Sequence, residues 1–492
     1  MSGVKFMSEK GRILKNTVIY AIRQVMAVLF PLITFAYVSR VLGVENIGIV
    51  NYTHSIATYF VILSGLGIST YAIRIGAQKR DNPDELNSFV SELLAINFIS
   101  TALSIVAYVA IVFSVESLKE YRGLLIVFSL LIPFTTLGIE WVYNIFEDFI
   151  YITIRSIIIQ LISFVSLFVF VRDFEDVFAY ACITVFATVG SCVLNFVHAR
   201  KYIKIKSVKL GKNLIRHISP VIMLFGMTIA TTLYTNMDTT MLGVYCGDYQ
   251  VGLYSAAHRV TKIIVQTIAV VRVVSLPALA RHANDENSHE KNSFVNLGSE
   301  ILGAVLLISI PVSIAVACGS DAILTVFSGA AFLEASPTLR LLSIDILLSV
   351  LSGILIYQYV LLKMGEKSAF LITVMGALAN LFLNYFFINT FQANGAAFAT
   401  CVSEFIVSAC AFFMAKRYIA LNVVGKQTLY GCIGGLIIVL FSILGRTAFG
   451  GSVVSVLGSL FLGGVLFVVL MIRIKNNIVY ESMISLMKKF RK

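Results

Sequence analysis

The stretch MLGVYCGDYQVGLYSAAHRVTK, residues 241–262, joins two long apolar runs and carries a histidine, an arginine and a lysine in its last five residues. An apolar run of about 20 residues is long enough to cross the hydrocarbon core of a bilayer. Because lipid offers the backbone no hydrogen-bond partners, each such run must be a helix. The stretch therefore predicts a turn between two membrane-spanning helices, of which the second carries cations into the membrane.

The composition of the whole chain is typical of a polytopic membrane protein. Its 492 residues are 58% hydrophobic and 13% charged, with a mean hydropathy of +0.90, whereas soluble domains contain about 25% charged residues. The basic N-terminal sequence runs into an apolar stretch with no small-residue cleavage site, so we expect it to remain as the first span. The predicted fold class is all-α.

The apolar runs predict about 14 transmembrane helices. The predicted spans cover residues 16–38, 47–71, 91–113, 123–143, 152–171, 177–197, 217–236, 251–276, 295–318, 336–360, 369–389, 395–414, 428–447 and 453–472.

Lysine and arginine are unequally distributed between the two sets of loops. If the N-terminus lies in the cytoplasm, most of the 38 basic residues lie in cytoplasmic segments. The positive-inside rule therefore predicts that both termini are cytoplasmic. The net charge of +12 then needs no nucleic acid, because the basic loop 198–216 faces the anionic inner surface of the membrane. The opposite side holds Arg40, Lys119, Arg122, Arg172 and Arg446.

One further apolar segment, residues 319–335, resembles a span in composition. Counting it as a span would place later basic segments on the outer side, against the positive-inside rule. We therefore expect it to be an interfacial or re-entrant element. The outer loops are all short, which leaves no room outside the membrane for a folded catalytic domain.

An internal repeat relates the two parts of the chain. Residues 42–44 match residues 242–244 at an offset of 200, and His54 matches His258 at an offset of 204. Both copies cross the turn between the first and second helix of a six-helix set, so spans 1–6 and 7–12 are predicted to be parallel repeats. In transporters built in this way the substrate binds between the repeats near the midplane of the membrane.

The repeat divides the chain into four predicted parts. Residues 1–197 form an N-terminal lobe of six spans, and residues 198–216 form a basic cytoplasmic linker. Residues 217–414 form a C-terminal lobe of six spans. Residues 415–492 add two extra spans and a basic cytoplasmic tail.

Basic residues inside the spans are the first candidates for a binding site. A charge there costs roughly 2.5–3.5 kcal/mol on insertion scales and usually faces a bundle interior or a water-filled cavity. Arg259 and Lys262 are three residues apart and share a helix face, and the first copy of the repeat has Ser55 and Thr58 in their places. Together with Arg23 they are predicted to line a central cavity. Such a cavity selects anions, because arginine matches phosphate oxygens in bidentate geometry.

Two alternatives remain for the buried cations. Arg272 and Arg340 lie near helix ends, where a structural role with the side chain reaching the interface is favoured, although Arg272 stays a candidate for the cavity. Arg259 and Lys262 have a structural alternative too, namely pairing with buried acids such as Asp345 or Glu404.

Acidic residues in the spans are candidates for coupling to H⁺ or Na⁺. Asp345 and Glu404 lie within predicted spans, and Asp238 lies just beyond the outer end of the seventh. Each could equally be a salt-bridge partner. His54 and His258 could titrate.

Sequence motifs of ATP hydrolysis and catalysis are absent. The chain contains no GxxxxGK[ST], HExxH or GxSxG. Its seven cysteines form no CxxC pair, and most fall inside spans, which predicts neither a disulfide framework nor a metal site. We therefore expect a secondary transporter without a cofactor, and not an enzyme.

Three segments resemble a known family. The sequence PLITFAYVSRVLGVENIGIVNYTHSIATYFVILSGLGISTYAIR, residues 31–74, resembles the N-terminal signature of bacterial polysaccharide-repeat flippases, the Wzx-type members of the multidrug/oligosaccharidyl-lipid/polysaccharide (MOP) exporter superfamily. Residues 237–263 and 380–400 are similar to further segments of this family. Two departures are Thr239, where a basic residue often follows the aspartate, and Ala72, where glycine is common.

The resemblance implies a two-lobed bundle that moves undecaprenyl-pyrophosphate-linked oligosaccharide from the cytoplasmic to the outer leaflet by alternating access, usually with an ion gradient. It implies partnership with a polysaccharide polymerase and glycosyltransferases. In this family Arg23 and Arg259 occupy helices that line the cavity, and Arg74 ends the first motif. The departure at Thr239 puts a role for Asp238 in doubt.

The predicted function is therefore that of a flippase of the bacterial inner membrane, serving the biosynthesis of O-antigen, capsule or exopolysaccharide. Arg259, Lys262 and Arg23 are expected to hold the pyrophosphate or acidic sugars. An ion-coupled multidrug exporter of the same superfamily is the nearest alternative, although it needs acids to dominate the cavity. A membrane polysaccharide polymerase or glycosyltransferase is a more distant alternative, because such enzymes need substantial outer loops.

Overall fold

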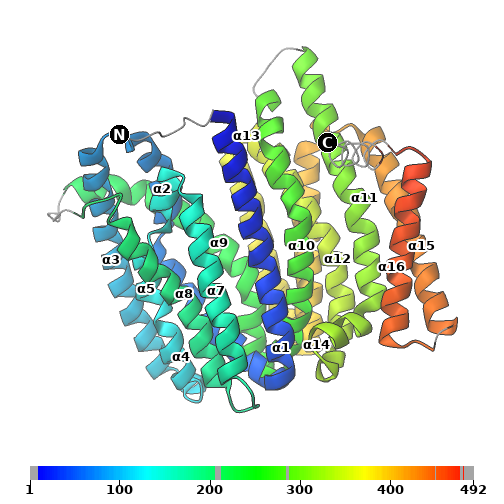
Figure 1. Ribbon diagram of the computed structural model, residues 1–492, viewed down its shortest axis with the longest axis horizontal. Coiled ribbons are helices and arrows are strands. Elements are labelled where there is room, and N and C mark those ends of the chain that lie inside the picture. Colours follow the sequence, from blue (N-terminus) through cyan, green and yellow to red (C-terminus); the bar gives the residue numbers. More distant parts are fainter. Residues whose placement is uncertain (1–8, 206–211, 284–287, 449, 477–479, 481–492) are drawn as a thin grey trace, which may run out of the picture. The chain divides into compact units, whose positions relative to one another are not determined.

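The computed structural model is built of helices, and no strand occurs in the residues it describes (Figure 1). By its internal contacts the chain divides into unit 1, Met1–Gly243, and unit 2, Val244–Lys492. The described residues are 9–205, 212–283, 288–448, 450–476 and 480, without the side chains of residues 9–29, 212–213, 227 and 288–292.

Unit 1 contains ten helical segments, the last of which crosses its boundary. They are α1 (Glu9–Gly65), α2 (Ile68–Lys79), α3 (Pro83–Ser114), η1 (Glu116–Leu118), α4 (Arg122–Ser129), α5 (Leu131–Leu137), α6 (Glu140–Phe146), α7 (Phe149–Phe170), α8 (Val177–Ala199) and α9 (Lys212–Cys246).

Helix α3 shows how the sequence fixes a helix start. The side chain of Asn82 accepts a hydrogen bond from the backbone N–H of Glu85, and Pro83 occupies the first helical position, where its missing N–H costs nothing. Further along, Leu103 and Val106 are 66% and 68% exposed. Large apolar side chains that face outward are expected where a helix contacts lipid.

Backbone breaks in unit 1 lie at a few special residues. Gly43 and Gly67 have φ angles of 75° and 69°, a left-handed conformation that glycine adopts without steric cost. The predicted span 123–143 is divided into α4, α5 and α6, and Ile139 at the start of α6 has a φ of 24°. This value is unusual for a β-branched residue.

Unit 2 is built in the same way. Its helical segments are α10 (Asp248–Ala283), α11 (Ser288–Phe327), η2 (Ala330–Ala335), α12 (Ser336–Ile354), the π-helix η3 (Leu355–Val360), α13 (Leu361–Met364), α14 (Glu366–Ala415), η4 (Lys416–Tyr418), α15 (Leu421–Ala448) and α16 (Val453–Arg473).

The helices confirm an all-α, multi-pass membrane protein. Among the described residues, 12 helical stretches are long and apolar enough to cross a membrane. Two of them, Phe30–Lys79 and Glu366–Tyr418, continue across backbone breaks at Gly43 and Gln392 and each cover two predicted spans. The structure is therefore compatible with about 14 spans.

Residues 319–335 do not form a re-entrant element, which was one of the two predicted alternatives. Helix α11 continues without interruption to Phe327, and residues 330–335 form the 3₁₀ helix η2, which leads into α12. Hydropathy located the apolar residues correctly. It did not show that they extend the preceding helix instead of forming a separate interfacial or re-entrant element.

The glycines at the two turns, Gly43 and Gly247, correct the register of the internal repeat. Gly43 breaks α1, and Gly247, with a φ of 79°, separates α9 from α10. These glycines are 204 residues apart, the offset that also relates His54 to His258. Residues 42–44 and 242–244 are identical in sequence but do not occupy equivalent positions of the repeat, because Gly243 lies within helix α9.

Two glycines at the end of α1 offer a matched test of this fold. At Gly67 an added Cβ would lie 2.8 Å from the backbone N of Phe225 in α9, at a φ of 69°, whereas nothing lies within 4 Å of a Cβ on Gly65. We expect Gly67→Ala to lower the free energy of unfolding by at least about 1–2 kcal/mol, the cost of a left-handed conformation. Thermal unfolding of the purified protein should show a lower midpoint for Gly67→Ala only. Equal midpoints for the two variants would contradict the close approach of α9.

Candidate functional site

Three basic side chains lie on the first half of α10. His258 stacks on Tyr254, one turn earlier, with the ring centroids 5.5 Å apart. Its Nδ1 atom is buried and has no hydrogen-bond partner among the described residues. Arg259 is half-buried and Lys262 is exposed, and both interact electrostatically with His258. The structure thus places the two predicted cations around one imidazole.

Small residues fix the position of this part of α10. Gly252, Ala256 and Ala257 are buried, which lets α10 approach its neighbours α11, α12 and α14 closely. The hydroxyl groups of Tyr254 and Thr400 are 3.5 Å apart and connect α10 to α14. The cations therefore project from a rigid helix and not from a loop.

Arg272 occupies the second half of α10, beside the π-helix η3. Its Nη1 atom would lie 2.8 Å from a Cβ on Gly353, and its guanidinium group lies 4.5 Å from the centre of the Tyr357 ring. Gln358 donates hydrogen bonds to the carbonyl of Arg272 at 3.2 Å and to the hydroxyl of Ser275 at 2.6 Å. The π-helix, a feature often found at functional sites, thus supports Arg272.

The predicted acidic residues of unit 2 are both buried and both accept hydrogen bonds from serines of α12. Ser349 donates to Asp345 at 3.0 Å, and Ser352 donates to Glu404 of α14 at 2.7 Å. The hydroxyl of Ser352 is also 3.1 Å from the carbonyl of Ser349. The serines therefore supply polar partners for both carboxylates within the core of unit 2.

Asp238 lies in unit 1 and is 3% exposed. Two residues further along α9, the hydroxyl of Thr240 lies 2.9 Å from both Ser55 and Tyr59 of α1. Tyr59 also interacts electrostatically with Asp238. The carboxylate is thus close to a group of hydroxyls that joins α9 to α1.

The remaining predicted cations differ in their surroundings. Arg74 is exposed on α2, and no hydrogen bond or ion pair is recorded for it in the described part of the chain. The side chain of Arg23 lies outside the described residues, although its backbone belongs to α1. Arg340 forms two hydrogen bonds with Asp321, at 2.8 and 2.9 Å, which is the kind of contact expected of a structural arginine.

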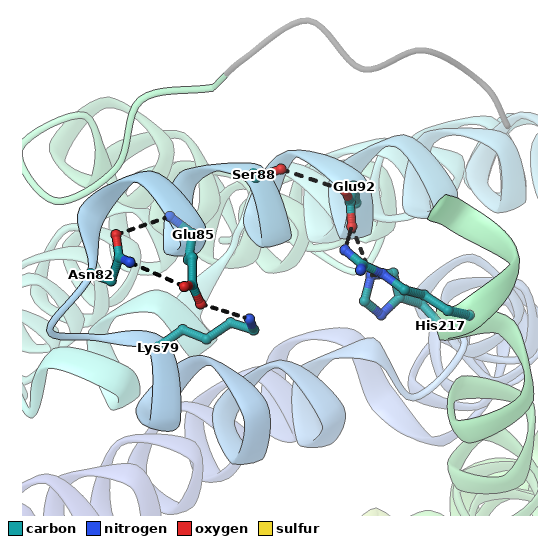
Figure 2. A network of polar contacts seen from close by, with 7 residues as sticks. Lys79, Asn82, Glu85, Ser88, Glu92 and His217 are labelled. Carbon is teal, nitrogen blue, oxygen red and sulfur yellow. Dashed lines mark hydrogen bonds and ion pairs between the residues drawn. The ribbon is translucent and has the colours of Figure 1, made fainter. Parts of the chain in front are cut away.

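A buried polar cluster at the start of α9 was missed by the sequence reasoning. Glu92 of α3 and His217 of α9 face each other in Figure 2, with 2.8 Å between Oε2 and Nε2. Arg216 donates to the same carboxylate oxygen at 2.8 Å, and the hydroxyl of Tyr71 lies 2.9 Å from Nδ1 of His217. Glu92 falls at the edge of a predicted span, but nothing in the sequence connects it to a histidine 125 residues away.

Arg155 forms a second missed pair in unit 1. Its side chain is 5% exposed and lies 3.3 Å from Glu140 at the start of α6. It also donates a weak hydrogen bond to the carbonyl of Ser191 in α8, at 3.4 Å. This arginine connects three helices, which makes it a structural residue.

The chemistry available in each unit follows from these contacts. No group of three or more histidine, cysteine or acidic side chains suited to a metal ion occurs within the described ranges. The cations of α10 can bind an anion, and the buried carboxylates can bind a proton or a small cation.

Comparison with known sequences identifies the family. The sequence model of the polysaccharide biosynthesis protein family matches residues 13–283. A putative O-antigen transporter of Escherichia coli (strain K12) is 24% identical over 251 residues, which cover 50% of this chain and 60% of that protein. A putative O-antigen transporter of Shigella dysenteriae is 24% identical over 236 residues, 47% of this chain and 58% of that protein. The chain thus matches less than two thirds of the length of these relatives.

Solved structures share the fold. The lipid II flippase MurJ in an inward closed conformation superposes with a TM-score of 0.72 and 15% identity, covering 95% of this chain and all 100% of that one. An inward-facing MATE-family multidrug resistance transporter of the MOP superfamily gives a TM-score of 0.58 and 13% identity, over 83% and 99% of the chains. The resemblance seen in three sequence segments is thus confirmed, and the chain belongs to the polysaccharide biosynthesis protein family.

Proposed function

We propose that the protein is a flippase for undecaprenyl-pyrophosphate-linked oligosaccharide in the biosynthesis of a surface polysaccharide of a bacterial inner membrane. The observation that carries the proposal is the grouping of Arg259 and Lys262 around His258 on a membrane-spanning helix. A charge at this depth is retained only where it meets a partner, water or a substrate. Family membership and the MurJ-like fold support the same class of function.

The cations have a defined role in this proposal. Arg259 binds phosphate oxygens through its planar guanidinium group, and Lys262 adds a point charge one turn further along. Arg23, Arg74 and Arg272 are the further candidates for this cationic cavity. The two lobes, residues 1–197 and 217–414, would rock about the bound headgroup with both termini in the cytoplasm.

Ion coupling is assigned to the buried carboxylates. Asp345 and Glu404 accept hydrogen bonds from serines within the core of unit 2, so uptake of H⁺ or Na⁺ would change the charge of that core. Asp238 is the corresponding candidate in unit 1. A polymerase and glycosyltransferases that consume or supply the lipid-linked substrate are the proposed partners.

The proposal differs from its two alternatives in measurable ways. A multidrug exporter of the same superfamily would move a cationic dye, which the cations of α10 disfavour. A polymerase or glycosyltransferase would lengthen glycans in the purified state, and the described segments between spans are too short to form a catalytic domain.

The binding site is tested by removing its two charges. Arg259→Ala combined with Lys262→Ala should weaken binding of the lipid pyrophosphate by about 100-fold or more, because each charge-assisted hydrogen bond contributes about 1.5–3 kcal/mol. In liposomes carrying undecaprenyl-pyrophosphate oligosaccharide, the fraction of sugar cleaved by an external glycosidase should fall to the level of protein-free liposomes.

Lys416→Ala combined with Arg417→Ala is the matched control, since it removes two exposed cations from η4, outside α10. Normal flipping in the α10 double variant would refute the site. Dye movement without flipping, by the unaltered protein, would favour the multidrug exporter instead.

The coupling residues are tested by removing one titratable group. Glu404→Gln keeps a partner for Ser352 but cannot release or bind a proton, so flipping driven by an imposed ion gradient should be lost while gradient-independent flipping persists. Glu300→Gln, an exposed position of α11, serves as the control. The same gradient dependence in Glu404→Gln and the unaltered protein would exclude Glu404 from coupling.

A further inference from the structure

The cluster of Glu92, His217, Arg216 and Tyr71 is outside the cationic site and has no role in the function proposed above. The side chains of Glu92 and His217 are each 5% exposed, whereas that of Arg216 is 59% exposed. Two buried titratable groups in direct contact are costly to maintain unless each is fully hydrogen-bonded. The distances between them constrain where their protons lie.

A proton must lie between Glu92 and His217. Two hydrogen-bond acceptors 2.8 Å apart would repel each other, and Oε2 of Glu92 already accepts from Arg216 as a carboxylate would, so we place the hydrogen on Nε2 of His217, which donates it to Oε2. Nε2 is then unable to accept from Arg216, whose Nε lies 3.2 Å away. The Arg216 Nε and His217 Nε2 atoms are therefore two donors that lie close together without a hydrogen bond between them. Arg216 is held instead by its hydrogen bond to Glu92.

The other ring nitrogen can gain a proton without loss of a contact. In neutral His217, Nδ1 accepts from the hydroxyl of Tyr71; in the imidazolium form, Nδ1 donates to the same oxygen. The change requires only that the Tyr71 hydroxyl hydrogen rotates. The ring itself stays packed edge-on against Tyr71 and Phe89 in both states.

Side chains from three helices set the net charge of the cluster. Tyr71 from α2, Glu92 from α3 and Arg216 from α9 are the titratable or charged groups recorded in contact with His217. At the turn between α2 and α3, Lys79 and Glu85 pair with each other (Figure 2). With neutral His217 the cluster has one negative and one positive charge, and an added proton leaves it with an excess positive charge.

We propose that Glu92 and His217 form a proton-binding site that joins α9 to α2 and α3. The proton comes from water and is added at Nδ1 of His217, and the imidazolium then neutralises Glu92. Arg216, now facing a like charge at 3.2 Å, moves fully into solvent at little cost because it is already mostly exposed. Protonation thus replaces the ionic contact of Glu92 with Arg216 by one with His217, the next residue of α9.

The site is tested first without transport. The full-length protein with ¹⁵N-labelled histidine is titrated in lipid nanodiscs between about pH 5 and 9, the range of histidine ionisation, and His217→Gln identifies the signal among the six histidines. We expect a neutral form protonated at Nε2 at high pH and the imidazolium at low pH. In Glu92→Gln the ratio of the two forms at a fixed pH should differ from that of the unaltered protein, because the adjacent negative charge is removed.

Tyr71→Phe is the milder variant, since it keeps the ring packing and removes only the hydroxyl. It should also change the ratio of the two forms at a fixed pH, because the charged form loses an acceptor for its second N–H. His282→Gln, in the last turn of α10, is the control and should leave the His217 titration unchanged. A His217 that keeps one charge state throughout the titration, or that titrates identically in Glu92→Gln, would overturn the proposal.

The consequence for transport rests on the proposed function and is measured separately. The rate of flipping in liposomes should depend on pH in the range where His217 titrates, and this dependence should be lost in His217→Gln and kept in His282→Gln. If the unaltered protein flips no lipid, the proposed function fails while the titration result stands. If it flips with a pH dependence that His217→Gln retains, the link between this site and transport is disproved.

Discussion

The requirement that every backbone polar group be hydrogen-bonded inside the membrane determines most of this structure. It makes each span a helix and confines breaks to a few positions. Gly43, Gly67 and Gly247 are among the residues that make sharp turns through left-handed backbone. Polar side chains obey the same requirement, since hydroxyls such as those of Thr53 and Ser403 donate to the carbonyl of their own preceding turn.

The spans could be predicted from the sequence because length and hydropathy are local properties. Residues 319–335 show the limit of that reasoning, because hydropathy does not reveal whether an apolar segment extends its neighbour. The repeat was predicted from the sequence, but its register at the turn required the φ angles of Gly43 and Gly247. The pairing of Glu92 with His217 depends on the packing of α3 against α9, which no local pattern encodes.

The buried charges described above receive two kinds of contact. In unit 1, acidic and basic groups meet directly, as in Arg155 with Glu140 and in His217 with Glu92. In unit 2, the carboxylates of Asp345 and Glu404 receive neutral serine hydroxyls. A hydroxyl stabilises a carboxylate without cancelling its charge.

The contacts that hold Arg272 in place also leave its charge uncancelled. Its guanidinium group rests on Gly353 and the ring of Tyr357, and in the described part of unit 2 no carboxylate pairs with it. A ring quadrupole holds a cation in place but leaves its field intact at longer range. Where water fills the space beside α10, that field reaches about 8–10 Å at physiological ionic strength. In the proposed function, Arg272 would therefore act on how fast an anion arrives as well as on how tightly it is held, and the rate of capture would fall as the salt concentration rises.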